Sequence, residues 1–174
     1  METLELRAAT ASDEKEIMDL LKETATWLKE KGSKQWNGIL EGRDNHHTDV
    51  AIAKGNVFVL EEEHKIVAVM ILYPSKTAWD TVLWKEEEEM DAFYLHRLTL
   101  SLDRRGERLA HRCLQWAIDH ARKEGKAAVR LDCLKKIPYL NQLYAEAGFR
   151  HLRTVEDFNA NEQIADFSLY EYKV

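Results

Sequence analysis

The stretch from residue 93 to residue 121 decides the fold: it reads Phe93-Tyr-Leu-His-Arg-Leu-Thr-Leu100, then Ser101-Leu-Asp-Arg-Arg-Gly-Glu-Arg108, then an amphipathic run from Leu109. This order predicts a strand, a short basic turn and the start of a helix. The free N–H groups and positive dipole end of a helix N-terminus attract anions, and three arginines add charge here. The stretch therefore predicts a local site for a phosphate-bearing ligand.

The chain after this turn predicts a parallel strand pair. The run from Leu109 has an apolar face with helical spacing and ends at Gly125, and residues 127–133 read as the next strand. A strand, a crossover helix and a second strand favour a right-handed parallel unit. The remaining elements predicted in this half are a short helix over 139–147, opened by Pro138 and ended by Gly148, and strands over 149–154 and 167–172 joined by a polar loop at 156–165.

The first half of the chain predicts a strand, two helices and a hairpin. Residues 4–7 alternate weakly, and a helix follows from Glu14 to Lys31, with Asp13 and Glu16 as its capping box and Gly32 at its end. The other expected elements are a loop over 33–45, a short helix over 47–53, hairpin strands over 57–60 and 65–73, and an irregular acidic segment over 75–91. Together the elements predict a mixed α/β fold with helices on both faces of one sheet.

Composition limits the function classes. The 174 residues suit one domain over 1–174, and 45% hydrophobic with 32% charged residues is ordinary for a globular protein. No long apolar run predicts a membrane span, and the N-terminus lacks the pattern of a signal peptide, so we expect a cytoplasmic protein. A net charge of -6 disfavours nucleic acid as a partner, and Cys113 and Cys133 have no partners at zinc-ligand or disulfide-framework spacing, so we expect no metal.

The turn itself excludes two common nucleotide sites. It has neither the Gly-Lys-Ser/Thr of a phosphate-binding loop nor the triple glycine of a dinucleotide fold. In element order and residues the chain instead resembles the GCN5-related N-acetyltransferase (GNAT) family. That family's acetyl-CoA turn follows Gln/Arg-x-x-Gly-x-Gly/Ala, and here Arg105 and Ala110 match its ends while Arg108 replaces its central glycine.

A second segment carries the same resemblance. Members often show Leu-Asp-Cys, then Asn, then Leu, then Tyr-x-x-x-Gly-Phe. This chain has Leu131-Asp-Cys133, Leu140 and Tyr144-Ala-Glu-Ala-Gly-Phe149, with Ile137 at the Asn position and Asn141 one helical turn further on. The strand over 94–100 and the loop that contains Gln35 and Trp36 are also similar in arrangement, so the resemblance covers nearly the whole chain.

The resemblance implies acetyl-CoA as co-substrate and a fold of the GNAT type. The pyrophosphate would bind at the backbone of the turn, which comprises Arg104, Arg105, Gly106, Glu107, Arg108, Leu109 and Ala110. The pantetheine arm would pair with the strand end formed by Leu98, Thr99 and Leu100. Tyr144 would be the general acid, because a tyrosine with an ordinary pKa near 10 can protonate a leaving thiolate whose pKa is about 8.5 at a penalty of about 2 kcal/mol.

The proton acceptor and the substrate are less determined by the sequence. Glu89, Asp91 and His96 remain alternative bases, and Trp36 and Trp84 are expected to wall the acceptor pocket. We expect a small-molecule or peptide amine as acceptor and a possible homodimer. The alternative is a degenerate member that binds acyl-CoA as a sensor or interaction module, suggested by the replaced glycine and asparagine; a nucleic-acid-binding regulator is a third, less favoured hypothesis.

Overall fold

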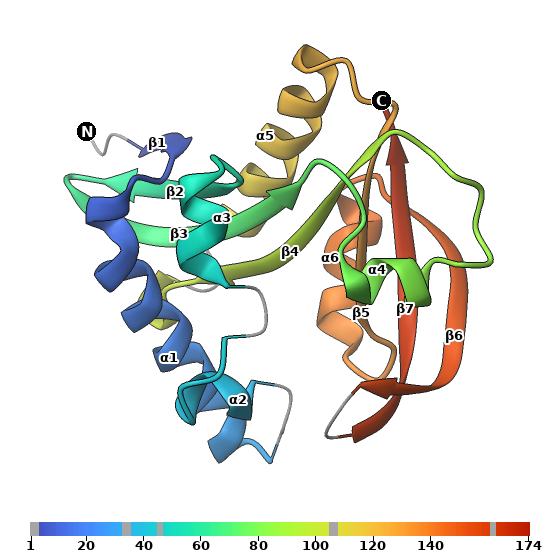
Figure 1. Cartoon of the computed structure of the whole chain (residues 1–174), viewed down its shortest axis with the longest axis horizontal. Coiled ribbons are helices and arrows are strands. Elements are labelled where there is room, and N and C mark those ends of the chain that lie inside the picture. Colours follow the sequence, from blue (N-terminus) through green and yellow to red (C-terminus); the bar gives the residue numbers. More distant parts are fainter. Residues whose placement is uncertain (1–3, 33–35, 45–46, 105–107, 161–162) are drawn as a thin grey trace. The chain divides into compact units, whose positions relative to one another are not determined.

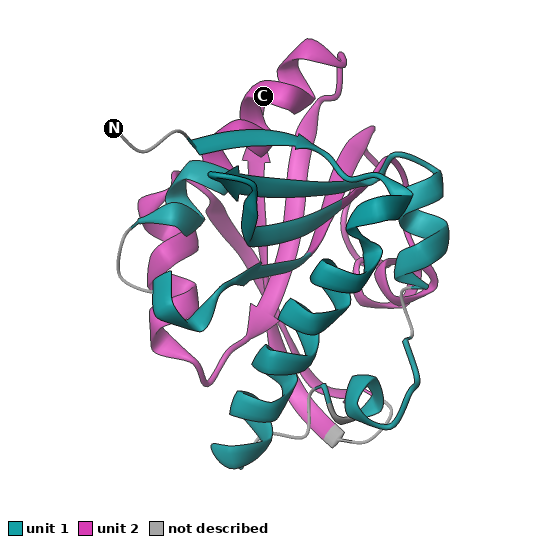
Figure 2. Cartoon of the chain, turned by 90° about the vertical axis from the view of Figure 1, so that its left-hand side faces the viewer, with its two compact units in different colours: residues 1–71, 97–113 teal, residues 72–96, 114–174 magenta. Residues whose placement is uncertain are grey.

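The structure is a computed structural model that describes residues 4–32, 36–44, 47–104, 108–160 and 163–174 (Figure 1). Its seven strands form one mixed sheet in the order β1-β2-β3-β4-β5-β7-β6, which confirms the mixed α/β class. The chain divides into two compact units (Figure 2): the first is Met1–Ile71 with Arg97–Cys113, and the second is Leu72–His96 with Leu114–Val174. β4 passes from one unit to the other between His96 and Arg97, inside the stretch that decided the fold.

The first unit contains an antiparallel β-meander. β1 (Leu4–Ala8) pairs with β2 (Val57–Glu62), and β2 pairs with β3 (Lys65–Tyr73). The turn between β2 and β3 is Glu63–His64, and both residues have positive φ, at 48° and 68°. Two successive left-handed residues match the twist of a tight hairpin, so the predicted hairpin is confirmed with a shorter turn.

The helices of the first unit follow the predicted pattern with one correction at the cap. A short 3-10 helix, η1 (Ala11–Asp13), precedes α1 (Glu14–Glu30), and the capping box belongs to Thr10 and Asp13. The prediction of a box between Asp13 and Glu16 is wrong, because the Glu16 carboxylate instead accepts a hydrogen bond from the Ile66 N–H at 2.9 Å. The later helices are α2 (Asn37–Leu40), inside the predicted loop, and α3 (Thr48–Ala53).

The second unit contains the predicted parallel pair. β4 (Ala92–Leu100) pairs with β5 (Ala128–Leu134) through three residue pairs, which end at Tyr94 and Arg130. α5 (Leu109–Lys123) connects them, and Gly125 ends it with φ 76°. α6 (Pro138–Glu146) follows β5, with the proline in its first turn as predicted.

The last two strands are longer than the sequence predicted. β6 (Arg150–Ala160) and β7 (Gln163–Lys173) form an antiparallel hairpin, and β7 also pairs with β5. The prediction of a polar loop over 156–165 is therefore wrong. β6 lies at the edge of the sheet and most of its side chains are partly or fully exposed, so polar residues are compatible with a strand there.

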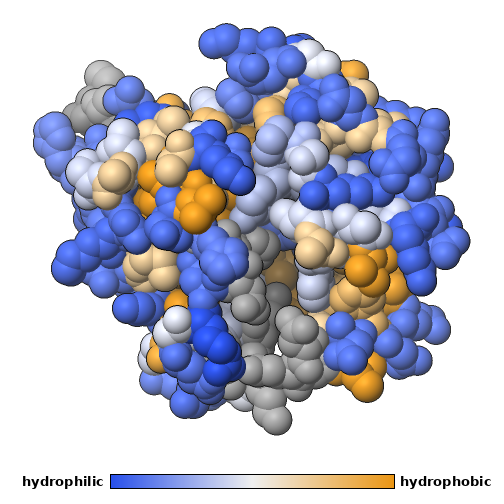
Figure 3. Space-filling model, in the orientation of Figure 1, coloured by the Kyte–Doolittle hydropathy of each residue, from blue (hydrophilic) through white to orange (hydrophobic). Residues whose placement is uncertain are grey.

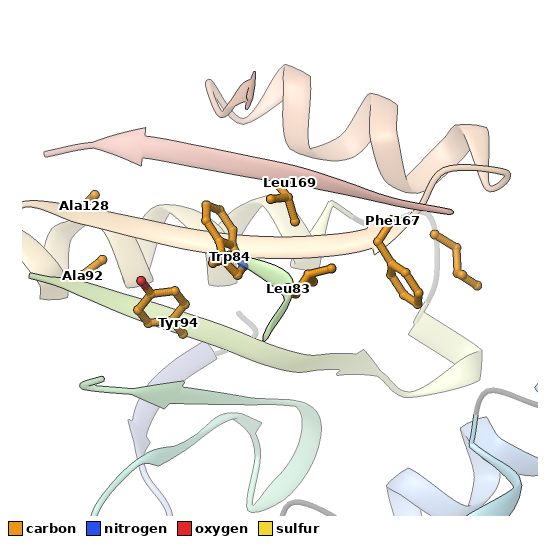
Figure 4. Close-up of a cluster of buried hydrophobic side chains, with 8 residues drawn as sticks. Leu83, Trp84, Ala92, Tyr94, Ala128, Phe167 and Leu169 are labelled. Carbon is orange, nitrogen blue, oxygen red and sulfur yellow. The ribbon is translucent and has the colours of Figure 1, made fainter. Parts of the chain in front are cut away.

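α4 (Ala78–Leu83) lies in the segment predicted to be irregular. Thr77 and Asp80 form its capping box, with the Thr77 hydroxyl accepting from the Asp80 N–H at 3.3 Å. Leu83 and the residue after α4, Trp84, enter a core cluster with β4, β5 and β7 (Figure 4). The acidic run that follows is held at the Glu88 carbonyl, which accepts a hydrogen bond from the Arg130 guanidinium at 2.8 Å.

Hydrophilic residues cover most of the face seen in Figure 3, with separate small hydrophobic patches between them. Exposed large apolar side chains come from several elements: Leu40, Val50, Val82, Tyr139 and Ile164. None of the helices in the described part of the chain is long and apolar enough to cross a membrane.

Candidate active site

The basic turn retains the predicted strand-turn-helix order. β4 ends at Leu100, a short 3-10 helix follows over Leu102–Arg104, and α5 begins at Leu109. The predicted cofactor residues Arg105, Gly106 and Glu107 lie outside the described residues. The first N–H groups of α5 have no acceptor within the helix, so this end keeps the donor geometry that an anion requires.

Arg104 has a structural role that the sequence prediction missed. Its guanidinium donates two hydrogen bonds to the Glu62 carboxylate of β2, one of them at 3.1 Å, and both side chains are mostly buried. Its backbone N–H donates to the Ser101 carbonyl at 3.0 Å. These donors tie the turn to the sheet, so we do not assign the Arg104 side chain to an anionic ligand.

Arg108 occupies the position where the resemblance expects glycine. Its φ is 59°, in the left-handed region that a residue without a Cβ adopts most easily, and its side chain is exposed. Its carbonyl accepts the Arg112 N–H at 3.2 Å, which begins α5. Leu109 is buried at 4% exposure and Ala110 is half-buried, so this part of the turn presents backbone rather than long side chains.

The strand end that was predicted to hold the pantetheine arm begins immediately after a backbone irregularity. Arg97 has φ 54°, an unusual value inside a strand. Leu98 and Leu100 are half-buried, and Thr99 is buried with its hydroxyl donating to the Arg97 carbonyl at 3.0 Å. Backbone positions held in such sparsely populated φ/ψ regions are frequent at active sites.

In the second unit, three titratable side chains meet just beyond the last β4–β5 pair. His96 lies two residues after Tyr94 on β4, and Asp132 lies two residues after Arg130 on β5, so both continue one face of the parallel pair. Asp80 comes from the first turn of α4. The His96 Nε2 lies 3.0 Å from each oxygen of the Asp80 carboxylate, and the Trp79 indole donates to Asp132 at 3.2 Å.

The surroundings of this Asp80–His96–Asp132 cluster perturb one carboxyl strongly. Burial raises the pKa of Asp132 to about 6, and the negative charge of Asp80 acts in the same direction. The ligand atoms of the three residues all lie within 4.8 Å of one another, a spacing that a divalent cation can bridge. The His96 Nε2 hydrogen-bonds to the Asp80 carboxylate, which is the arrangement of a base and the acid that orients it.

Tyr144 lies in α6 and is buried at 7% exposure. Its ring packs against Phe149 and Tyr170, with centroid distances of 6.3 and 5.7 Å. Burial raises the pKa of its phenol well above the usual range, so the hydroxyl stays protonated. Among the described residues, we find no hydrogen-bond partner for this hydroxyl.

Asn141 does not replace the missing family asparagine as a free group. Its amide nitrogen donates to the carbonyls of Leu134, Lys135 and Ile137 at 3.2, 3.3 and 2.9 Å. Its oxygen accepts the Tyr170 hydroxyl at 2.8 Å. Asn141 therefore holds the connection between β5 and α6, which positions Tyr144 on its helix.

A family model described as the acetyltransferase (GNAT) family matches residues 15–149, which include α1, the basic turn and the Tyr144 segment. The chain belongs to the GNAT acetyltransferase family. It is also 37% identical over 144 residues to the uncharacterised N-acetyltransferase YesJ of Bacillus subtilis strain 168, covering 83% of this chain and 80% of that protein. These matches confirm the resemblance and support an acetyltransferase enzyme.

Solved structures agree with the GNAT assignment. A GNAT-family acetyltransferase from Listeria monocytogenes 4b F2365 has a TM-score of 0.80 and 32% identity, covering 98% of this chain and 95% of that one. The PaiA N-acetyltransferase of Thermoplasma acidophilum, solved in complex with coenzyme A, has a TM-score of 0.72 and 15% identity, covering 99% of each chain. At this identity the second match supports the fold alone.

Trp84 needs a correction within this GNAT domain. Its side chain is 0% exposed, and its ring lies 5.9 Å from that of Tyr94 (Figure 4). The Arg130 guanidinium carbon lies 4.7 Å from the centroid of the Trp84 ring. A side chain without exposed surface cannot wall an acceptor pocket, so the prediction for Trp84 is wrong. Trp36, in contrast, is half-buried, with the Arg97 guanidinium carbon 5.9 Å from its ring centroid.

The ion pairs and exposure of the three candidate bases of this GNAT protein distinguish His96 from the other two. Glu89 pairs with Lys76 at 2.7 Å and its side chain is 84% exposed, while Asp91 pairs with Lys126 at 2.8 Å and is 71% exposed. His96 has a side-chain exposure of 10% and a buried carboxylate partner. One signal in the sequence could have revealed this site: side chains two residues apart on a strand share a face, so His96 and Asp132 lie on the same face of the β4–β5 pair. We did not draw this inference from the sequence.

Proposed function

We propose that this GNAT protein transfers the acetyl group of acetyl-CoA directly to a primary amine of a small molecule or peptide. The amine nitrogen attacks the thioester carbonyl carbon, the carbon–sulfur bond breaks, and no acetyl-enzyme forms. An acceptor that arrives as an ammonium loses two protons from its nitrogen, one before the attack and one after it; one proton is delivered to the CoA sulfur and the other is released to water. The observation that carries the proposal is the buried hydrogen bond between His96 and Asp80, 3.0 Å long, because it supplies an oriented proton acceptor.

His96 accepts the amine proton in this mechanism. An ionised Asp80 only accepts hydrogen bonds, so the 3.0 Å contact favours a proton on the His96 Nε2 and a lone pair on Nδ1. An alkyl ammonium with a pKa of about 10.4 resists deprotonation at pH 7 by roughly 4 to 5 kcal/mol. Asp80 offsets part of this penalty because it stabilises the imidazolium that forms.

The second carboxylate favours a cationic acceptor. Asp132 lies in the same cluster, and its pKa of about 6 means that it is largely ionised at neutral pH. Two carboxylates beside one imidazole leave a net negative site, which attracts an ammonium group and raises its local concentration. We therefore infer an acceptor that arrives as a cation.

Tyr144 protonates the leaving sulfur. Its hydroxyl has no partner among the described residues and stays protonated because burial raises its pKa. A phenol that is a weaker acid than the thiol does not transfer its proton early; it donates a hydrogen bond that strengthens as charge develops on sulfur. Because the raised pKa makes proton transfer to sulfur more unfavourable than it is for an ordinary tyrosine, this hydrogen bond is the main contribution of Tyr144, and its proton moves only after the carbon–sulfur bond has broken.

The cofactor contacts that we propose are mostly backbone contacts. The N–H groups of Arg108, Leu109 and Ala110 at the start of α5 would bind the pyrophosphate, as in a helix N-terminal anion site. The strand end Leu98–Leu100 would pair with the pantetheine arm, and Trp36 would wall the acceptor pocket. The coenzyme A complex of PaiA, a protein with the same fold, supports acetyl-CoA as the ligand.

The His96 assignment is tested by steady-state kinetics of His96→Gln. We expect kcat to fall by about 10²- to 10⁴-fold, the range for loss of a general base, with little change in the affinity for CoA measured by calorimetry. His151→Gln is the control, because His151 is exposed on β6, where its Nε2 lies 3.1 Å from the Thr154 hydroxyl and its ring centroid lies 5.4 Å from that of Tyr170. A His96→Gln variant that keeps more than half of the wild-type kcat removes His96 from this role.

The alternative is an acyl-CoA sensor without turnover. The replacement of the family's glycine and asparagine by Arg108 and Ile137 favours it. Tight CoA binding without thiol release on any amine would select the sensor.

A further inference from the structure

Arg97 links three parts of the first unit through one side chain. It follows His96 directly on β4, has φ 54°, and its side chain is only 9% exposed. The unusual backbone separates two neighbouring networks: His96 belongs to the Asp80–His96–Asp132 cluster, and Arg97 belongs to a network with Asp44 and Thr48. The proposed proton acceptor, His96, and the residue that anchors the second network, Arg97, are therefore consecutive in β4.

The contacts of Arg97 show what it fixes. Its Nη1 donates to the Asp44 carboxylate at 2.7 Å and to the Thr48 hydroxyl at 3.3 Å. The other oxygen of Asp44 accepts the Thr48 N–H at 2.8 Å, so it satisfies the first N–H group of α3. The guanidinium carbon also lies 5.9 Å from the centroid of the Trp36 ring, within the range of a cation–π contact.

The electrostatics of this network indicate that Asp44 is ionised in the folded chain and pairs with the Arg97 guanidinium. Burial alone would raise the pKa of Asp44, but the hydrogen bonds from Thr48 and Arg97, with the arginine's charge, lower it to about 2. Thr48 is buried at 1% exposure. Removing the guanidinium would take the arginine charge and the Nη1 hydrogen bonds away from Asp44 and Thr48 in a partly desolvated place, so the segment should loosen locally.

We propose that Arg97 is a positioning residue that sets the affinity for the acceptor amine by holding Trp36 and the start of α3 to β4. This inference rests on the proposed function, in which Trp36 walls the acceptor pocket and Leu98–Leu100 hold the cofactor arm. A planar guanidinium can donate to Asp44 and Thr48 while it stacks on an aromatic ring, whereas a lysine ammonium lacks that plane. Arginine at this position is therefore a specific requirement.

The test compares Arg97→Lys with a matched control, Arg7→Lys. Arg7 lies in the same unit and also binds two carboxylates, Asp13 at 2.8 Å and Glu61 at 2.7 Å, but neither is assigned to a ligand. We expect Arg97→Lys to raise the acceptor KM at least tenfold while the acetyl-CoA KM stays within twofold. Arg7→Lys should leave both KM values within twofold.

A double-mutant cycle tests whether Arg97 acts on acceptor binding through Trp36. If Arg97 acts through the tryptophan, Trp36→Ala combined with Arg97→Lys should raise the acceptor KM no further than Trp36→Ala alone. The proposal is overturned if the two substitutions multiply their effects on the acceptor KM, or if Arg97→Lys raises both KM values equally. It is also overturned if Arg7→Lys raises the acceptor KM as much as Arg97→Lys does.

Hydrogen exchange separates this inference from the proposed function. Amide exchange of the Thr48 N–H should become at least tenfold faster in Arg97→Lys and remain unchanged in Arg7→Lys, whether or not an acceptor is turned over. Unchanged exchange at Thr48 refutes the anchoring. Faster exchange in a protein that acetylates no amine would refute the proposed function, and with it the acceptor role of Arg97, while the anchoring itself stands.

Discussion

Replacing Asp132 by asparagine should stabilise the protein at neutral pH. Burial raises the pKa of this carboxyl from an ordinary value near 3.8 to about 6. At 1.36 kcal/mol per pKa unit, keeping the carboxylate ionised in the folded state costs about 3 kcal/mol relative to the unfolded chain. Asparagine has nearly the same shape, carries no charge, and keeps an oxygen that can accept the Trp79 indole N–H.

The sign of the pH dependence follows from the raised pKa. Below about pH 4 the carboxyl is protonated in both states, and the variant should match the wild type. As the pH rises from about 4 to about 6, the unfolded chain has lost this proton while the folded wild type still binds it, so the wild type becomes less stable relative to the variant until the loss is complete above pH 6. The full difference of about 3 kcal/mol should be present at pH 7.5 and above.

Urea denaturation at intervals between pH 4 and pH 8 measures this difference directly. A gain of 3 kcal/mol corresponds to a rise of about 6 to 12 °C in Tm for a domain of this size. Glu156→Gln is the control, because Glu156 is exposed on β6 and its change should stay within about 0.5 kcal/mol. An Asp132→Asn variant that is no more stable than the wild type at pH 7.5 contradicts the reasoning; a stabilised variant with weaker acceptor binding fits a charged site retained for function.

Three further predictions concern the catalytic groups and the turn. Tyr144→Phe should lower kcat by about 10²- to 10⁴-fold while calorimetry finds the CoA affinity nearly unchanged, and unchanged turnover would remove Tyr144 from the acid role. Arg108→Gly should relieve a left-handed residue, worth about 1–2 kcal/mol, against about 0.5–1 kcal/mol of added chain entropy, so thermal denaturation should show a net gain of roughly 0.5–1 kcal/mol. The same variant should keep its CoA affinity within about threefold, because the exposed side chain is not assigned to the phosphates; a loss beyond tenfold would show that the guanidinium binds them. Dialysis against EDTA should leave kcat and both KM values within twofold, and activity lost on dialysis and restored by zinc would place a metal in the Asp80–His96–Asp132 cluster.

The fold was predictable where local signals and the global pattern agree. The strand, turn and helix around Arg108, the hairpin before Pro74, and the helix opened by Pro138 each combine hydrophobic period with a glycine or proline stop, and all are present. The elements that we did not predict from the sequence are short or lie at an edge of the sheet. α4 has only six residues, and β6 carries polar side chains because much of its surface faces solvent.

The site was predictable only in part, because its decisive contacts join distant residues. The Tyr144 segment is contiguous and could be recognised from its own motif. His96 and Asp80 are separated by sixteen positions and belong to different elements, and the helix that carries Asp80 was not predicted. Trp84 was misassigned, and the contact of the Arg104 side chain was missed, for the same reason: their partners, Arg130 and Glu62, are far away in sequence and decide whether each side chain is available to a ligand.

The most direct test of the account is a thiol-release assay of the wild-type protein with acetyl-CoA and a panel of primary amines, with the products examined by mass spectrometry. We expect CoA release in step with formation of an N-acetylated product, fastest with acceptors that are cationic at neutral pH. CoA binding by calorimetry without release on any primary amine would contradict it.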